Sequence, residues 1–259
     1  MRGSYGFDAP AAFLGLVAGA LVLAALAALS FAEDVWFAGI AFLLGAVYTA
    51  LSAASHAYTT RRGKFAVWRG LLRLRGDERL LDLGCGRGAV LMTAATRLPE
   101  GRAVGVDLWR SRDQPGNAAR ATVANAGREG VADRVELVTG DLRALPFGDE
   151  AFDVVVSSLA VHNIPGREGR SRALTEALRV LRPGGRLMIA DFRHTADYED
   201  VLREHGVTDV RRRDLGWRFW YGGPWFATWL LEGTKPPRRE EPQEAEATRR
   251  GSPSGPTRA

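Results

Sequence analysis

Two long charge-free runs open the chain. Residues 11–32 carry no charged side chain, and residues 35–55 carry none either. Each run is long enough for a helix to cross a hydrocarbon core of about 30 Å. Because only Glu33 and Asp34 separate the runs, we predict a transmembrane helical hairpin within an anchor that covers residues 1–60.

Two other interpretations of these runs are weaker. A signal peptide has a shorter apolar stretch than residues 11–32, and it is not followed at once by a second span. A buried hairpin of a soluble protein is the other alternative. Buried helices of soluble proteins seldom lack charge over two successive stretches of this length, so the membrane interpretation is favoured.

From residue 79 onward, short apolar runs alternate with helix-like stretches. Strands are expected at 79–84, 102–108, 134–142, 152–161 and 186–192, helices at 89–98, 116–130, 167–181 and 198–206, and a closing antiparallel pair at 209–215 and 225–235. Such alternation is typical of α/β proteins. We therefore predict a seven-stranded, doubly wound, mostly parallel sheet in a domain that covers residues 77–235.

Two further segments flank this domain. Residues 61–76 are basic, and Phe65 and Trp68 fall near one face of a predicted helix. This amphipathic helix fits the surface of an anionic membrane, and it fits equally well as the first helix packed on the sheet. Residues 236–259 lack periodic apolar positions and are predicted to be disordered.

The charge distribution gives the hairpin an orientation. Arg2 precedes the first run and Arg61, Arg62, Lys64 and Arg69 follow the second, whereas the connecting loop has no basic residue. Basic residues favour the cytoplasmic side, so both termini and the domain are expected there. A net charge of +5 also invites a nucleic-acid interpretation. The basic flank beside the membrane explains the charge better, and no RNA-binding module is recognisable.

Small residues and the single cysteine narrow the remaining options. Gly15 and Gly19 form a small-xxx-small pair, which favours close helix packing and would suit a homodimer through the transmembrane helices. Cys85 is the only cysteine, so no internal disulfide forms. No cluster of cysteines and histidines offers a metal site, and we predict none.

The segment LDLGCGRG, residues 81–88, carries the first chemical signal. Gly84, Gly86 and Gly88 follow a predicted strand and open a predicted helix. With Ala89, the spacing fits the dinucleotide fingerprint, and Asp107 ends the next strand where an acid would hold ribose hydroxyls. A membrane-tethered NAD(P)-dependent oxidoreductase is therefore one hypothesis.

Further features favour S-adenosylmethionine. Asp82 offers a polar group beside the glycine loop for a methionine ammonium, and Asp141 follows the third strand, where it can accept from an adenine amino group. The fourth strand ends in SSLAVHNI, and VLRPGGRLMIADF supplies a helix, a glycine turn and a strand in the required order.

Together these motifs resemble the class I S-adenosylmethionine-dependent methyltransferases, and within them the small-molecule and lipid-related branch of the ubiquinone and menaquinone methyltransferases. The resemblance covers about residues 77–235 and implies a Rossmann-like methyltransferase sheet with S-adenosylmethionine as its cofactor. The cofactor-binding residues that it implies are Asp82, Gly84, Cys85, Gly86 and Gly88 at the methionine and ribose, Asp107 with Leu108 at the ribose, Asp141 with Leu142 at the adenine, and Ser157 after the fourth strand.

The acceptor side is less defined. His162 is a candidate general base and Asn163 a candidate for orienting the acceptor, although His162 also fits a purely structural role. Asp191 and Tyr198 are weaker pocket candidates. The hairpin and the aromatic segment 215–229 suggest a small or lipid-like acceptor.

Two questions stay open at this point. The polar loop 107–117, with Asp113, Gln114 and Asn117, fits either a contact with the adenosine or a plain surface loop. A non-catalytic membrane protein that binds S-adenosylmethionine is the third hypothesis for the chain.

Overall fold

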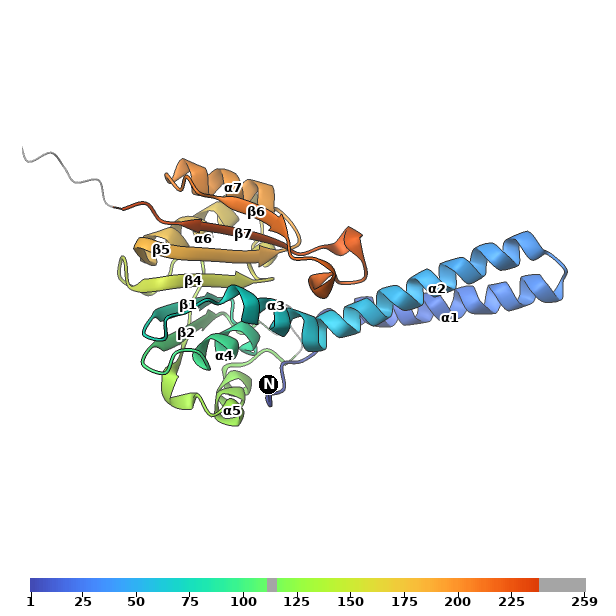
Figure 1. Cartoon of the computed structure of the whole chain (residues 1–259), viewed down its shortest axis with the longest axis horizontal. Coiled ribbons are helices and arrows are strands. Elements are labelled where there is room, and N and C mark those ends of the chain that lie inside the picture. The colour runs from blue at the N-terminus through green and yellow to red at the C-terminus, as the bar shows by residue number, and fades with distance from the viewer. Residues whose placement is uncertain (111–115, 238–259) are drawn as a thin grey trace, which may run out of the picture.

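One seven-stranded sheet forms the centre of the molecule, and a helical hairpin projects from it (Figure 1). The computed structural model describes residues 1–110 and 116–237. The strand order is β3-β2-β1-β4-β5-β7-β6. Strands β1 to β5 run parallel, and β7 is antiparallel to both β5 and β6. This is the predicted Rossmann-like methyltransferase sheet.

The elements have the following bounds. The strands are β1 (Arg79–Leu83), β2 (Arg102–Asp107), β3 (Val135–Thr139), β4 (Phe152–Ser158), β5 (Leu181–Asp191), β6 (Arg211–Asp214) and β7 (Trp229–Thr234). The helices are α1 (Pro10–Ala32), α2 (Trp36–Tyr58), α3 (Lys64–Leu71), α4 (Ala89–Ala95), α5 (Ala119–Glu129), α6 (Arg167–Val180) and α7 (Thr195–Glu204).

Helices cover both faces of the sheet. Helices α3, α4 and α5 share one buried apolar cluster, and α6 and α7 share the other. Successive residues of β1 divide between them: Leu80 belongs to the first cluster and Leu81 to the second, and both are fully buried. A parallel strand buried on both faces explains why β1 reads as a continuous apolar run.

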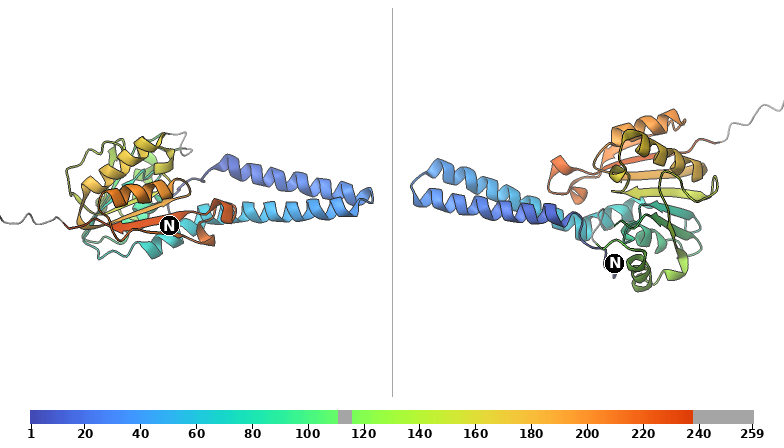
Figure 2. Two further views of the ribbon diagram at one scale, coloured as in Figure 1. Left: turned by 90° about the horizontal axis from the view of Figure 1, so that it is seen from above. Right: turned by 180° about the vertical axis from the view of Figure 1, so that it is seen from behind.

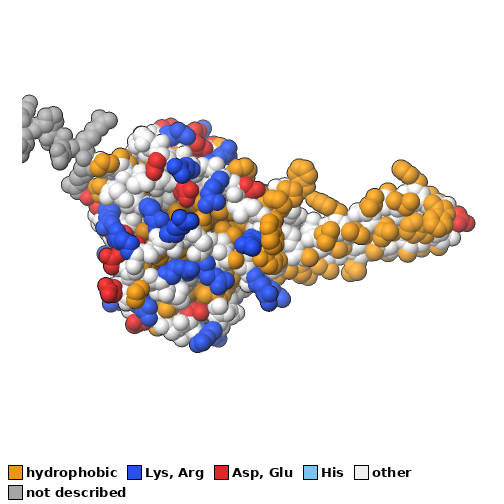
Figure 3. Space-filling view, viewed as in Figure 1, with side chains coloured by type: hydrophobic (Ala, Val, Ile, Leu, Met, Phe, Trp, Pro, Cys, Tyr) orange, Lys and Arg blue, Asp and Glu red, His pale blue; other side chains and the backbone are white. Residues whose placement is uncertain are grey.

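The hairpin of α1 and α2 extends well away from the domain (Figure 2). Both helices are long and apolar enough to cross a membrane. Apolar side chains cover the visible length of the hairpin, and acidic side chains mark its far end, where Glu33 and Asp34 connect the two helices (Figure 3). Gly19 faces Thr49 of α2, whereas a side chain at Gly15 would meet open space. The homodimer stays a prediction.

Helix α2 continues into the domain. A π-helical turn, Thr59–Gly63, joins it to α3, so the predicted amphipathic helix is shorter than expected and is not separate from the second span. The apolar face of α3 packs on the sheet: Trp68 is 1% exposed and its Nε1 donates to Ser158 Oγ at 3.0 Å. Since Phe65 is buried as well, this face is part of the core rather than a lipid-facing surface.

The aromatic segment wraps around the base of the hairpin. Thr59 Oγ1 donates to the carbonyl of Trp220 at 2.8 Å. A Cβ on Gly63 would lie 1.9 Å from the carbonyl oxygen of Arg218, so only glycine allows this close approach. Phe219 is fully buried, whereas Trp217 and Trp225 stay exposed.

Two boundary predictions change. Helix α6 ends at Val180 and β5 begins at the next residue, so the glycine turn expected at 183–185 lies inside β5. The register there jumps from the pair Phe152 and Leu181 to the pair Val154 and Arg186, which makes the segment a bulge. The predicted disordered tail lies outside the described residues from 238 onward.

Candidate active site

A cavity of about 1130 Å³ lies at the carboxyl ends of the parallel strands. Parallel strands bring the residues that follow them to one edge of the sheet, so distant sequence positions meet there. The predicted site residues on its wall are Asp82, Gly84, Cys85, Gly86, Asp107, Leu108, Asp141, Leu142, His162 and Asn163.

The glycine loop forms the floor of this cavity. The N–H of Gly84 donates to the carbonyl of Val106 at 2.8 Å, which ties the loop to β2. Gly84 and Gly88 have φ of +68° and +83°. A Cβ on Gly84 would lie 2.3 Å from Cβ of Ala160. Both the backbone conformation and the space therefore require glycine, and the loop leaves room for a ligand to lie against its backbone.

Asp107 organises the loop. Its Oδ2 accepts the N–H of Gly86 at 2.9 Å, and its Oδ1 accepts from the N–H of Trp109 at 2.6 Å and from Nδ2 of Asn117 at 3.1 Å. The carboxylate is thus fixed at the end of β2, where ribose hydroxyls are expected. Asn117 belongs to this arrangement, whereas Asp113 and Gln114 lie outside the described residues.

Burial controls the protonation of two side chains on the cavity floor, the carboxyl of Asp82 and the thiol of Cys85. Burial raises the pKa of Asp82 from 3.8 to about 7, and the neighbouring charge of Asp107 adds to the rise. Burial also raises the pKa of the Cys85 thiol, so this cysteine is a neutral, small loop residue rather than a reactive thiolate. A cationic ligand, such as one carrying an ammonium and a sulfonium, offsets the cost of ionising Asp82.

Asp141 is a further acid on the cavity wall. The guanidinium of Arg143 donates to both carboxylate oxygens, at 2.6 Å from Nη2 to Oδ2 and 3.0 Å from Nε to Oδ1. These bonds lower the pKa of Asp141 to about 2. The carboxylate is therefore ionised at neutral pH, and it retains lone pairs for an adenine amino group.

Two predicted cofactor contacts do not lie on the cavity wall. Ser157 is fully buried and its hydroxyl donates to the carbonyl of Leu83 at 3.0 Å, while Ser158 lines the cavity in its place. Side chains alternate along a strand, so neighbouring serines face different ways. Gly88 instead precedes the first residue of α4, where its positive φ starts the helix.

The acceptor side centres on His162. Its Nδ1 lies 2.7 Å from Oδ1 of Asp191, at ion-pair distance but without the alignment of a hydrogen bond. Asp191 is fully buried, and its Oδ2 accepts the backbone N–H of His162 at 3.0 Å. Tyr198 OH approaches the same oxygen at 3.4 Å. The carboxylate thus holds the imidazole, and Phe192 packs against it edge-on. His162 itself lines the cavity.

A second polar group on the cavity wall is absent from the sequence-based prediction. Lys64 Nζ lies 2.7 Å from Oδ2 of Asp8, and Tyr221 OH donates to the same oxygen at 2.8 Å. His56 Nε2 lies 2.8 Å from the carbonyl of Asp8. The sequence could have indicated this polar group, because Asp8 is the only acid before residue 33 and Lys64 is one of only two lysines.

Comparisons with known proteins agree with this geometry. Residues 81–189 match the family described as a methyltransferase domain. The ubiquinone/menaquinone biosynthesis C-methyltransferase UbiE of Roseobacter denitrificans is 38% identical over 118 residues, which cover 46% of this chain and 44% of that protein. The 27-O-demethylrifamycin SV methyltransferase of Amycolatopsis mediterranei is 36% identical over 123 residues, covering 48% and 42%.

Solved structures share the fold. The [4+2]-cyclase SpnF superposes with a TM-score of 0.56 at 20% identity, covering 68% of this chain and 81% of that chain. A SAM-dependent methyltransferase from Aquifex aeolicus gives a TM-score of 0.52 at 16% identity, covering 67% and 89%. At these identities the likeness concerns the fold alone.

Sheet order, glycine loop and strand-end acids define a class I S-adenosylmethionine-dependent methyltransferase domain, and S-adenosylmethionine is the cofactor of this class. Within the class, the domain resembles the UbiE-type C-methyltransferases. The chain spans about half the length, or less, of these curated relatives. The match to the family model begins at residue 81, after the hairpin.

The raised pKa of Asp82 makes stability depend on pH. The group titrates near 3.8 when unfolded and near 7 when folded, so the free energy of unfolding should fall as pH rises through this window. Asp82→Asn should remove that fall and be more stable than the parent at pH 8. Chemical denaturation of the detergent-solubilised full chain at pH 5 and pH 8 measures this.

The same substitution should weaken the binding of S-adenosylmethionine, because ionised Asp82 attracts its ammonium. Titration calorimetry at both pH values should show binding that tightens with pH in the parent only. Glu100→Gln, on the exposed surface, is the matched control. Parallel pH profiles of stability in the parent and Asp82→Asn would contradict the assignment.

Proposed function

We propose that this chain is a membrane-anchored, S-adenosylmethionine-dependent methyltransferase that acts on a small or lipid-like acceptor at the cytoplasmic face of the membrane. One observation carries the proposal. The glycine loop, Asp82, Asp107 and His162 line a single cavity, and buried Asp191 lies behind His162, so a cofactor site and a candidate base face the same space.

The names of the relatives support a hydrophobic acceptor. They include a ubiquinone/menaquinone C-methyltransferase, a methyltransferase of demethylrifamycin and the sterol 4-C-methyltransferase of Caenorhabditis elegans, which is 31% identical over 137 residues. The first and third act on carbon according to their names. The apolar wall residues near His162, which include Leu142, Ile164 and Phe192, suit an acceptor of this kind.

The residues divide the chemistry as follows. When bound, S-adenosylmethionine supplies an electrophilic methyl group on its sulfonium. The glycine loop, Asp82 and Asp107 would hold that cofactor so that an acceptor atom could take the methyl group, with the carbon–sulfur bonding pair leaving on sulfur. His162 takes the acceptor's proton at Nε2, and Asp191 stabilises the resulting imidazolium. Holding both reactants in line supplies much of the rate.

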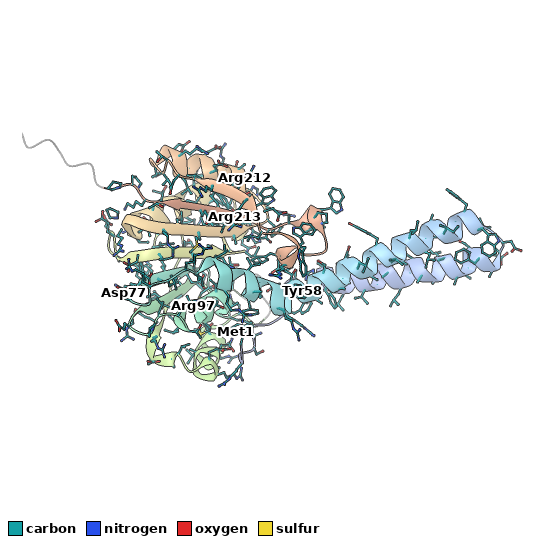
Figure 4. The ribbon with its side chains drawn as sticks, viewed as in Figure 1. Met1, Tyr58, Asp77, Arg97, Arg212 and Arg213 are labelled. Atoms are coloured by element: carbon teal, nitrogen blue, oxygen red, sulfur yellow. The ribbon has the colours of Figure 1, made fainter. Side chains whose placement is uncertain are left out.

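The hairpin supports membrane anchoring. Each of its helices has 23 residues, which at 1.5 Å per residue gives about 35 Å. Large apolar side chains such as Leu21, Phe37 and Leu44 are more than half exposed, and a bilayer would remove this apolar surface from water. Tyr58 lies at the base of the hairpin, where the domain begins (Figure 4). Trp217 stacks on Tyr58, and Trp225 donates from Nε1 to the hydroxyl of Tyr48. Aromatic side chains favour that depth in a membrane.

Cofactor binding separates this proposal from the oxidoreductase hypothesis. Calorimetry on the full chain in nanodiscs should show binding of S-adenosylmethionine and none of NAD. Asp107→Ala should weaken that binding by about 10- to 100-fold, since hydrogen bonds to a charged group are lost. Binding of NAD instead would refute the assignment.

Substitution of His162 tests the catalytic role. His162→Gln should lower transfer of labelled methyl groups into a lipid extract by about 100-fold or more, with unchanged affinity for S-adenosylmethionine. His205→Gln, on the exposed surface of the same domain, is the control. An unaltered rate and pH profile in His162→Gln would reduce the residue to a packing role. If the parent and every variant bind S-adenosylmethionine but transfer no labelled methyl group, the chain would be a non-catalytic binding protein.

Topology has its own test. Glu33→Cys should react with a membrane-impermeant maleimide added outside intact cells, whereas Arg62→Cys should react only after permeabilisation. The parent provides the background, because its single cysteine is buried. Release of the chain from membranes by alkaline carbonate, or the opposite labelling pattern, would show that the hairpin does not span the bilayer in this orientation.

A further inference from the structure

The cavity continues past the cofactor loop to the membrane anchor. Its wall includes Ala11, Ala12, Gly15 and Leu16, which form the first two turns of α1. The transmembrane hairpin therefore does more than hold the domain near a bilayer. It forms part of the same cavity that contains the glycine loop and His162.

Buried polar contacts hold α1 in this place. Asp8 lies two residues before the helix, and its carboxylate meets Lys64 of α3 and Tyr221 of the aromatic segment at 2.7 and 2.8 Å. The side chain of Lys64 is only 8% exposed. Losing one partner would leave a charge buried without its counter-ion, so these contacts fix the start of α1 against the domain.

The N-terminal segment adds a second attachment. The N–H of Ser4 donates to Oδ1 of Asn125 at 2.8 Å, and Tyr5 OH donates to Glu129 at 2.8 Å, both on α5. Arg87 of the glycine loop reaches Ser4 Oγ at 3.3 Å. The chain before α1 thus lies across the cofactor side of the domain, so α1 starts beside the cofactor loop.

The character of the wall changes along the cavity. The strand ends contribute Asp82, Asp107, Asp141 and His162 to the wall, and the joint with the hairpin contributes Asp8, His56, Lys64 and Tyr221. Helix α1 contributes only alanine, glycine, proline and leucine. Phe226, which is 54% exposed, lines the cavity as well. The α1 residues of the wall lie where the hairpin leaves the domain (Figure 1).

We propose that the first two turns of α1 are a wall of the acceptor site, and that the acceptor is an amphiphile that reaches the cavity from the bilayer. Its reactive head lies beside His162, and its apolar part lies along Ala12 and Leu16 toward the lipid. The reaction in this inference rests on the proposed function. The path from the bilayer along α1 into the cavity does not.

Photo-crosslinking tests the path without any need for catalysis. The probe is a long-chain alcohol with a diazirine on its chain, in nanodiscs of phosphatidylcholine that contain the full chain. Adducts are expected on the peptides that carry Ile164 and Phe192, which line the cavity in the domain and belong to neither span. Adducts confined to the outer surface of the hairpin would overturn the proposal.

Paired substitutions in α1 sharpen this test. Ala12→Phe should fill the cavity beside α1 and abolish the adducts at Ile164 and Phe192. Ala18→Phe makes the same change at an exposed position that is not on the cavity wall, and should leave them intact. Equal labelling of both variants would show that α1 is not part of the path.

Activity then distinguishes the two proposals. Ala12→Phe should lower methyl transfer into a lipid extract by about 100-fold, since a small misplacement of the acceptor costs that much, while its affinity for S-adenosylmethionine stays that of the parent. Cavity adducts in a chain that transfers no methyl group would refute the proposed function alone. Full transfer by Ala12→Phe would refute the acceptor wall alone.

Discussion

The parallel arrangement of five strands is the constraint on which the site depends. Strands that run the same way place every following loop at one edge of the sheet. Asp82, Asp107 and Asp141 are far apart in sequence, yet they line one cavity because each lies within, at or just after the carboxyl end of a parallel strand. Asp191 ends β5 at the same edge and reaches His162 after β4.

The glycine loop and its acids show a conflict between stability and binding. A carboxylate at Asp82 is costly in the empty protein, because burial and the charge of Asp107 both disfavour ionisation. The same position is favourable once a cationic ligand supplies the opposite charge. Strongly shifted pKa values of this kind are common at binding sites.

The joint between the hairpin and the domain extends this arrangement toward the hairpin. Helix α2 runs through a π-helical turn into α3, and Trp68 of α3 packs in the core beside β4. Asp8 holds the start of α1 through Lys64 and Tyr221. Both helices of the hairpin are therefore fixed to the domain at the carboxyl edge of the sheet, and the orientation of the hairpin follows from core packing.

The sequence alone determined the elements whose signals are local. Charge-free length predicted two long apolar helices, and apolar alternation predicted the sheet. The spacing of glycines and acids predicted a loop and two acids, Asp107 and Asp141, that line one cavity, while their contacts with a cofactor and the crossing of a membrane stay predictions. These signals need only the neighbouring residues, because propensity, period and backbone sterics act over a few positions. The membrane orientation likewise depends on local charge and remains a prediction.

Tertiary structure decided which side chains face the cavity and which elements meet. Ser158 rather than Ser157 lines the wall, since the register of β4 against β1 sets the facing of each residue. The packing of α3 on the sheet, the contact between Asp191 and His162, and the place of α1 in the cavity wall all join residues far apart in the chain. No local pattern encodes such contacts, because they arise only when the long-range packing of the core is complete.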